Sequence, residues 1–281
     1  MKIALTGATG FIGRHLVAEL VQRGHEITLL VRDPQKLDAL RRPGVRTIQF
    51  DLYAPANSAA EVGKHDALIH LAWPGLPNYK ELFHFEENLP ASYRFLKACI
   101  EAGVPQVLVT GTCFEYGMRD GCLAENMETL PANSYSLAKD TLRKFLERLR
   151  EKQPFVLQWI RLFYMYGPGQ NSNSLLAQLD HAIDKGDPVF NMSGGEQLRD
   201  YLPVEQVASG LARVAEHAEC DGITNVCSGV PISVRKLVER RIESRNARIE
   251  LNFGYYPYPN HEPMAFWGDA HKFEAIISSA P

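Results

Sequence analysis

The sequence predicts an α/β fold in which a doubly wound parallel sheet carries helices on both faces. Two observations support this prediction: short apolar, β-branched runs alternate with stretches of helical periodicity, and the alternation repeats from the start of the chain to about residue 163. Apolar runs are typical of parallel strands, because helices bury both faces of such a sheet. The expected strands are 2–7, 26–31, 45–50, 67–72, 106–111 and 155–163.

The expected helices lie between these strands. The first, FIGRHLVAELVQRG (11–24), has apolar residues at helical spacing and closes on Gly24. The others are expected near 35–42, 57–63, 79–102 and 135–151.

The chain changes character beyond Gly167. Loop sequences such as GPGQNSNS, SGGEQ and FGYYPYPNHEP separate short helices there, which predicts a small irregular C-terminal substrate lobe. We expect one domain from 1–166 with a return segment near 203–230. The lobe would then comprise 167–202 and 231–281.

The composition indicates a globular protein. The chain has 281 residues, 45% of them hydrophobic, and a net charge of -3, so neither nucleic acid nor an anionic membrane is an expected partner. Five cysteines without a C-x-x-C pair and nine histidines without ligand spacing predict reduced thiols and no metal. The first residues, MKIALTGATGFIG, lack a cleavage site and are too short and glycine-rich for a membrane span, which predicts a cytoplasmic protein.

Three glycines separate the first expected strand from the first expected helix. In TGATGFIG (6–13), Gly7 can adopt a φ closed to other residues, Gly10 lets backbone approach a pyrophosphate, and Gly13 allows close packing of the helix. The helix N-terminus adds N–H donors. These features predict a Rossmann-type dinucleotide site, with an ordinary glycine-rich turn as the alternative. Its residues are Gly7, Thr9, Gly10, Phe11, Ile12 and Gly13.

The residues after the second and third strands indicate which dinucleotide is bound. An acid usually holds the adenosine ribose, but Val31 ends the second strand here and Arg32 follows. A guanidinium binds a 2′-phosphate that a carboxylate would repel, so NADP is favoured. NAD stays possible, because Asp33 could take the ribose. Asp51, followed by Leu52, is expected near the adenine amino group or as a turn cap.

Two tyrosine–lysine pairs share one spacing. YSLAK contains Tyr135 and Lys139, and YRFLK contains Tyr93 and Lys97. In both pairs the lysine lies one helical turn after the tyrosine. The spacing alone therefore does not identify an active site.

The order of several motifs distinguishes the two pairs. Over most of its length the chain resembles the extended short-chain dehydrogenase/reductase family, which works mostly on nucleotide-activated sugars. The matching motifs are TGATGFIG, IHLA (69–72), VTGTCFEYG (109–117), NSYSLAK (133–139), RLFYMYGPGQ (161–170) and RDYLPVEQVA (199–208). The resemblance implies that Tyr135 is the active tyrosine and that Thr112 hydrogen-bonds the substrate oxygen. YRFLK is then a coincidence on a packing or subunit-facing helix.

The chemistry gives Lys139 a role beside Tyr135. A phenol has a pKa of about 10, and a neighbouring ammonium stabilises the phenolate, so we expect Lys139 to lower the pKa of Tyr135. The resemblance implies that Lys139 also binds the nicotinamide ribose. It further places three residues at the end of the fourth strand beside the cofactor, with core packing as the alternative for the last: Leu71, Ala72 and Trp73.

The residues after Thr112 bear on the type of reaction. Related sugar-nucleotide dehydratases have Asp-Glu at this point, whereas Cys113 and Phe114 stand here and cannot replace them. Arg32 favours NADPH, and hence reduction of a keto group in a nucleotide-diphospho-sugar. A 4-epimerase holding NAD is the alternative, and relatives with similar motifs reduce other small carbonyl compounds. Redox-sensing relatives without turnover usually lack the Tyr or Lys that is present here.

The expected substrate contacts rest on the resemblance. Arg199 matches a residue that pairs with the substrate diphosphate, and an ion pair with Asp200 or another acid is the alternative. Tyr164 stands where relatives carry a diphosphate-binding Asn. Asn88 is expected in a structural or relay role, or as a cap before Pro90. The resemblance also suggests a homodimer built from helices 79–102 and 135–151.

Overall fold

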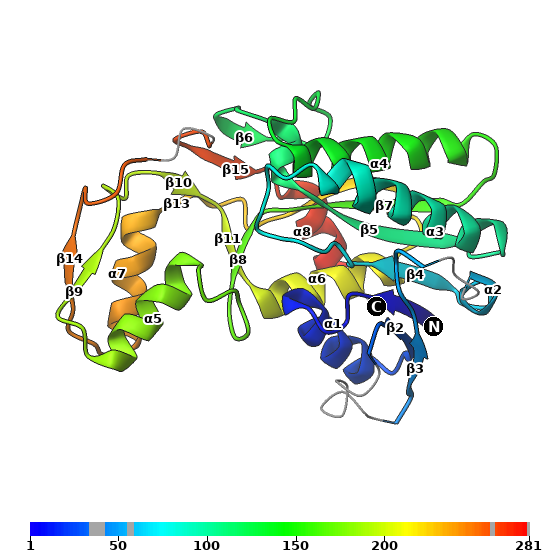
Figure 1. The fold of residues 1–281 in the computed structure, drawn as a ribbon, viewed down its shortest axis with the longest axis horizontal. Helices are drawn as coiled ribbons and strands as arrows, with labels where there is room; N and C mark the ends of the chain where they lie inside the picture. Colours follow the sequence, from blue (N-terminus) through cyan, green and yellow to red (C-terminus); the bar gives the residue numbers. More distant parts are fainter. Residues whose placement is uncertain (34–42, 55–58, 259–261, 280–281) are drawn as a thin grey trace.

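A parallel seven-stranded sheet forms the centre of the molecule (Figure 1). The computed structural model describes residues 1–33, 43–54, 59–258 and 262–279. In the order β3-β2-β1-β4-β5-β7-β12, the strands are Val45–Gln49, Glu26–Val31, Lys2–Thr6, Ala67–His70, Gln106–Thr112, Val156–Leu162 and Gly222–Val226. The chain moves outward from β1 to β3 and then returns to the other side of β1. The reversal between β1 and β4 is the point at which such sheets bind ligands.

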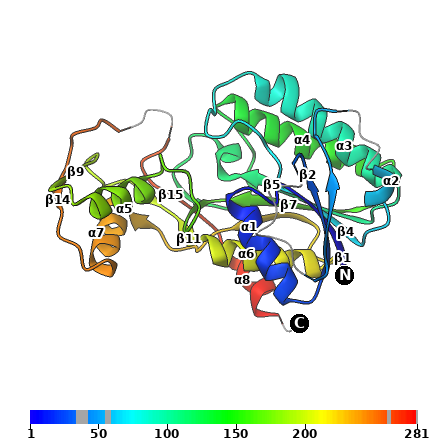
Figure 2. The ribbon, with the colours of Figure 1, turned by 60° about the horizontal axis from the view of Figure 1, so that its bottom comes forward.

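Helices cover both faces of the sheet, as predicted (Figure 2). One face carries α1 (Phe11–Gln22), α6 (Val204–Glu216) and α8 (His271–Ser278), whose apolar side chains share a core with β1 and β2. The other face carries α2 (Ala59–Val62), α3 (Leu89–Glu101) and α4 (Ser134–Arg150). The helix expected near 35–42 lies outside the described residues, and the helix expected at 57–63 is described only as α2.

The long helix expected at 79–102 begins later than predicted. A π-helical turn, η2 (His84–Asn88), leads into α3, and the residues before His84 form a loop. Long-range hydrogen bonds hold this loop at the start of α4, because the carbonyl of Tyr79 accepts from the Tyr135 N–H at 3.0 Å. The carbonyl of Lys80 likewise accepts from Ser134 Oγ at 2.9 Å. Two carbonyls of the loop therefore bond to α4, while turn bonds such as the one from the Glu81 N–H to the Asn78 carbonyl at 3.2 Å lie within the loop.

A smaller lobe extends from the sheet on the left of Figure 1. Helices α5 (Leu175–Lys185) and α7 (Val234–Ser244) pack around their own apolar core, which includes Leu179, Phe190 and Val238. Its paired strands are β9 (Val189–Asn191) with β14 (Glu250–Asn252) and β10 (Leu198–Arg199) with β13 (Ile232–Ser233). The lobe is thus more regular than the loops and short helices expected from the sequence.

Two further strand pairs lie between the lobe and the sheet. Strand β8 (Tyr164–Tyr166) pairs with β11 (Tyr201–Pro203), and β6 (Gly121–Leu123) pairs with β15 (Phe266–Gly268). A 3-10 turn, η3 (Cys113–Tyr116), follows β5. Helix α8 packs on the sheet, although residues 231–281 were expected in the lobe. The domain boundaries stay a prediction. Within the described ranges, no helix is long and apolar enough to cross a membrane.

Candidate active site

A cleft of about 870 Å³ opens at the carboxyl ends of the strands, at the reversal between β1 and β4. It runs from the glycine turn after β1, past the ends of β4 and β5, to β8 and the start of α5. The predicted residues that line it are Gly7, Thr9, Gly10, Phe11, Ile12, Gly13, Arg32, Asp51, Leu52, Leu71, Ala72, Trp73, Thr112, Tyr135 and Tyr164. Lys139, Asn88 and Arg199 are not among its lining residues.

The glycine turn forms a tight cradle at the N-terminus of α1. Gly7 has a φ of 76°, and a Cβ there would lie 2.8 Å from the backbone nitrogen of Ala72. A Cβ on Gly13 would lie 2.1 Å from the Gly7 carbonyl oxygen. Gly10, the N-cap, supplies no side-chain cap, so the N–H groups of the first turn face the cleft without a side-chain partner. This arrangement fits a pyrophosphate.

Gly13→Ala and Gly10→Ala should separate the architecture of the turn from its contact with the cofactor. Gly13→Ala forces the turn apart, so we expect the Kd for NADPH to rise about a hundredfold and the Tm to fall. Gly10→Ala places a Cβ at 3.2 Å from the Gly7 carbonyl oxygen, a contact that small shifts relieve, so the Tm should hold while NADPH binds more weakly. Calorimetry and NADPH fluorescence titration measure both quantities. Equal Tm values with unchanged Kd values in the two variants would contradict this account.

Tyr135 and Thr112 meet where α4 begins and β5 ends. Asn133 starts α4 as its N-cap, accepting from the Ser136 N–H at 2.9 Å, and this places Tyr135 in the first turn. Thr112 is the last residue of β5 and the N-cap of η3. The Thr112 side chain lies near the Tyr135 hydroxyl, where it favours the ionised phenol. Both side chains line the cleft, as the predicted pairing requires.

The ionisation of Tyr135 differs from the expectation. Burial raises the pKa of Tyr135 above its ordinary value, with Tyr79 and Glu115 adding to the rise, and the Thr112 side chain offsets it only in part. Lys139 is not among the largest contributions to this pKa. The pKa of Tyr135 is therefore raised and not lowered as expected, because desolvation of the phenolate dominates. At neutral pH the phenol is protonated and ready to donate.

Lys139 lies behind Tyr135 and is 1% exposed. Its Nζ donates to the carbonyl of Thr110 at 2.8 Å and lies 4.0 Å from the ring centroid of Trp73. Burial lowers the pKa of Lys139 to about 7, and the negative charge of Glu115 opposes this shift. The site therefore contains a lysine whose charge changes near neutral pH.

Glu115, which the sequence analysis did not single out, supports Thr112 from within the core. It is fully buried, and its Oε1 accepts from the Thr112 N–H at 2.9 Å. Its Oε2 lies 2.8 Å from Arg161 Nε, and both oxygens lie 3.1 Å from Trp159 Nε1. The available signal was an acid in the apolar stretch TCFEYG, but its partners on β7 are more than forty residues away in sequence. Glu115 thus ties the end of β5 to β7.

The structure does not bring Arg199 to the cleft. The Arg199 side chain is 2% exposed and forms an ion pair with Glu262 at 2.9 Å. An ion pair with an acid was the expected alternative to diphosphate binding, but the acid is Glu262 and not Asp200. It also donates to the Leu198 carbonyl at 2.8 Å. Tyr164 stands nearby, with the Arg199 guanidinium carbon 5.8 Å from its ring centroid, and its buried hydroxyl has no hydrogen-bond partner among the described residues.

Asn88 has a structural position beside the cleft. Its Nδ2 donates to the Pro74 carbonyl at 2.9 Å, and its Oδ1 accepts from the Tyr53 hydroxyl. Its side chain makes no helix-capping hydrogen bond, so the capping alternative does not hold. Asp51 does cap its turn, since its Oδ1 accepts from the Tyr53 N–H at 3.1 Å while the residue lines the cleft.

The second tyrosine–lysine pair lies on α3. Tyr93 packs against Phe145 of α4 with ring centroids 5.3 Å apart, and Lys97 pairs with Glu101 at 3.6 Å. Neither Tyr93 nor Lys97 lines the cleft. The reading of YRFLK as a packing element agrees with these contacts.

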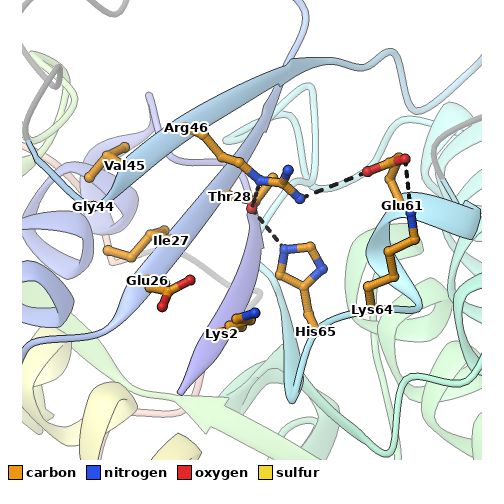
Figure 3. A pocket seen from close by; sticks show the side chains of 10 residues that line it. All are labelled: Lys2, Glu26, Ile27, Thr28, Gly44, Val45, Arg46, Glu61, Lys64 and His65. Carbon is orange, nitrogen blue, oxygen red and sulfur yellow. Dashed lines mark hydrogen bonds and ion pairs between the residues drawn. The ribbon is translucent and has the colours of Figure 1, made fainter.

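A second pocket, of about 550 Å³, lies at the amino ends of β1, β2 and β3 (Figure 3). Thr28 Oγ1 accepts from Arg46 Nε at 2.7 Å and lies 2.7 Å from His65 Nε2. Glu61 pairs with Lys64 at 3.3 Å. These polar groups satisfy one another, so the pocket gives no indication of a ligand. Across the described parts of the chain, no cluster of three or more His, Cys, Asp or Glu residues could hold a metal ion.

Comparison with known proteins agrees with this geometry. Residues 3–227 match the NAD dependent epimerase/dehydratase family. The chain is 30% identical to dTDP-6-deoxy-L-talose 4-dehydrogenase (NAD(+)) of Aggregatibacter actinomycetemcomitans over 95% of this chain and 99% of that protein. It is 28% identical to dTDP-6-deoxy-L-talose 4-dehydrogenase (NAD(P)(+)) of Kitasatospora kifunensis, covering 89% of this chain and 81% of that protein.

Solved structures show the same similarity. The structure of MoeE5 in complex with UDP-glucuronic acid and NAD superposes with a TM-score of 0.83 at 28% identity, covering 98% of this chain and 92% of that one. The family match spans the glycine turn, Thr112, Tyr135 and Lys139. The chain therefore belongs to the NAD dependent epimerase/dehydratase family, as an NAD(P)-dependent enzyme of the extended short-chain dehydrogenase/reductase type.

Proposed function

We propose that this enzyme uses NADPH to reduce the 4-keto group of a nucleotide-diphospho-sugar to a hydroxyl. The observation that carries the proposal is that a protonated Tyr135 and Thr112 line the same cleft, with Lys139 buried one helical turn after Tyr135. Position 4 and the nucleotide sugar come from the names of the relatives, two of which are 4-dehydrogenases of a dTDP-6-deoxy sugar. Such an enzyme works in either direction according to the supply of ketone and cofactor.

Each residue has a defined part in the proposed reaction. Bound NADPH supplies the hydride to the keto carbon. Thr112 Oγ1 holds the keto oxygen, and Tyr135 gives that oxygen its proton, so ketone, NADPH and one proton become alcohol and NADP⁺. The raised pKa of Tyr135 keeps the phenol protonated and suits it to this direction. Lys139, as an ammonium, stabilises the phenolate that is left after the proton is given up.

The positions next to Thr112 support reduction over dehydration. Cys113 is 5% exposed, and burial holds the pKa of its thiol well above the usual range, so it is neutral at all working pH values. Phe114 contributes an aromatic ring to the cleft and cannot exchange protons. Water elimination from a sugar needs an acid and a base at these positions, which this chain does not supply.

The test is a spectrophotometric assay at 340 nm with NADPH and a dTDP- or UDP-linked 4-keto-6-deoxyhexose. We expect oxidation of one NADPH per sugar reduced. NAD that stays bound through purification, together with conversion of a 4-hydroxy sugar to its epimer without added cofactor, would favour the epimerase alternative. Absence of any turnover with intact NADPH binding would favour a redox-sensing protein.

Arg32→Ala tests the proposed preference for NADPH. Arg32 lies exposed at the cleft beyond the end of β2, and Val31 occupies the position where an acid would hold a ribose. Loss of one charge-assisted contact to the 2′-phosphate should reduce the ratio of kcat/KM for NADPH over NADH about tenfold. The kcat/KM for NADH should stay within about twofold of that of the unmodified enzyme. An unchanged ratio would show that Arg32 does not bind the 2′-phosphate and would favour NAD as the cofactor.

We also propose that two copies associate through α3 and α4. These helices lie side by side along one surface (Figure 1), with Leu137 46% and Phe145 45% exposed. Phe145→Glu would place a charge within that apolar surface, so it should convert a dimer to a monomer in sedimentation velocity at micromolar concentration. A monomeric unmodified protein would contradict the proposal. The cytoplasmic location stays a prediction.

A further inference from the structure

The indole of Trp73 and the imidazole of His84 form a fixed unit beside the proposed catalytic residues. Trp73 Nε1 donates to His84 Nδ1 at 3.0 Å, and the two rings are nearly parallel, with an interplanar angle of 14° and centroids 6.4 Å apart. His84 Nε2 in turn lies 3.0 Å from the Asn78 carbonyl, to which it donates. Both imidazole nitrogens are therefore committed, which fixes the tautomer of His84.

His84 stays neutral in this arrangement. The residue is fully buried, and burial lowers the pKa of His84 below its ordinary value. A neutral imidazole with Nε2 protonated can accept from Trp73 at neutral and alkaline pH. The indole is thus held at a fixed angle by a hydrogen bond that does not titrate with the rest of the site.

The held indole presents its face to Lys139. Lys139 Nζ lies 4.0 Å from the Trp73 ring centroid, and the Tyr135 ring lies 6.2 Å from the same indole. An indole face attracts a cation, and the attraction is strongest where water is excluded. Burial therefore lowers the pKa of Lys139, whereas the indole face raises it.

Four titratable groups surround the Lys139 ammonium. Glu115 stabilises its charge, whereas His70 and His84 are neutral and contribute none. Burial and Lys139 together lower the pKa of His70 to about 3. Tyr135 is protonated in the ligand-free chain. Two groups in direct contact therefore favour the ammonium among the described residues, the Trp73 indole face and the Thr110 carbonyl.

We propose that Trp73, held in place by His84, is a positioning residue that keeps Lys139 charged at neutral pH. The effect of this charge on catalysis rests on the proposed function. The charge of Lys139 itself does not, because it can be measured in the absence of cofactor and substrate. Trp73 itself exchanges no proton. It acts through Lys139, whose ammonium stabilises the Tyr135 phenolate.

The test is a pH titration of the lysine ¹³Cε chemical shifts in the 281-residue protein labelled at lysine, without cofactor or substrate. The Lys139 signal is identified by its loss in Lys139→Arg. We expect Trp73→Leu to lower the pKa of Lys139 by about one unit, and Trp73→Phe, which retains a weaker π-face, to lower it by less. His84→Leu, which frees the indole, should also lower it. Trp267→Leu, a tryptophan change in β15, should leave it unchanged.

The pH dependence of the reaction gives a second readout. Lys139 loses its charge as pH rises through its pKa, so kcat should fall on the alkaline side near pH 7 in the unmodified enzyme. In Trp73→Leu the same fall should begin about one pH unit lower, with little change at more acidic pH. A uniform loss at every pH would indicate only a structural role.

The outcomes separate this inference from the proposed reaction. An unchanged Lys139 pKa in folded Trp73→Leu and Trp73→Phe overturns the inference, whatever the enzyme catalyses. A shifted pKa in a protein without ketone reductase activity upholds the inference and overturns the proposed reaction. Should Trp73→Leu not fold, Trp73→Phe and His84→Gln carry the same titration, and the former must still shift the pKa downward.

Discussion

Tyr135→Phe should lower kcat for ketone reduction about a thousandfold. The phenol is the proton donor beside Thr112 in the cleft, and loss of a general acid typically costs two to four powers of ten. The ring stays in place, so the Kd for NADPH should change less than about twofold. Steady-state kinetics with a nucleotide 4-keto sugar and a separate NADPH titration measure the two effects.

Tyr93→Phe is the matched control, because Tyr93 has a lysine at the same spacing but lies on α3 outside the cleft. Its kcat should equal that of the unmodified enzyme. A Tyr135→Phe enzyme with undiminished turnover would show that another group donates the proton. Large losses in both variants would indicate a general packing effect.

Glu115→Ala should lower the free energy of unfolding by about 3–5 kcal/mol. Arg161, 1% exposed, would then be a buried cation without its carboxylate, and the Thr112 N–H and Trp159 Nε1 would lose their acceptor. Urea denaturation followed by intrinsic fluorescence measures the change. Because Glu115 also orients Thr112, kcat should fall in the fraction that stays folded.

Glu151→Gln is the control for this ion pair. Glu151 pairs with Arg148 on the surface, where the side chains are 56% and 80% exposed, so its loss should cost less than about 1 kcal/mol. Equal destabilisation by Glu115→Ala and Glu151→Gln would show that burial of the Arg161 pair does not matter. Full stability of Glu115→Ala would show that the Glu115 carboxylate is dispensable.

Six of the seven strands of the sheet were predicted from the sequence, whereas β12 was not. β1, β4 and β5 are buried apolar runs bounded by turn residues, a pattern typical of the strands of a parallel sheet. The start of α3 was not predictable. Residues near Tyr79 have helical spacing, but the carbonyl of Tyr79 bonds to the Tyr135 N–H, and no local pattern reports a partner so far along the chain.

The site was predictable where it depends on local motifs. The glycine turn, Thr112 and Tyr135 meet in one cleft, as their order along the chain implied. The sequence did not decide whether Arg199 binds substrate or pairs with an acid, because its partner Glu262 lies sixty-three residues away. His84 and Glu115 were missed for the same reason: their roles depend on Trp73 and Arg161, which reach them only through the fold.

Ionisation was the least predictable property of the site. A tyrosine with a lysine one turn away suggests a lowered phenol pKa, but burial outweighs that effect and raises it. Burial depends on the whole cleft, including the loop that carries Tyr79, and sequence spacing contains no measure of desolvation. The same burial lowers the pKa of Lys139 to about 7.

The most direct test of the proposed reaction uses NADPH carrying deuterium at both positions of nicotinamide carbon 4. Incubated with the enzyme and a dTDP-linked 4-keto-6-deoxyhexose, it should deliver one deuterium to carbon 4 of the sugar for each NADP⁺ formed, as seen by NMR and mass spectrometry. A sugar without deuterium at carbon 4, or one epimerised while the cofactor is unchanged, would contradict the proposed reductase.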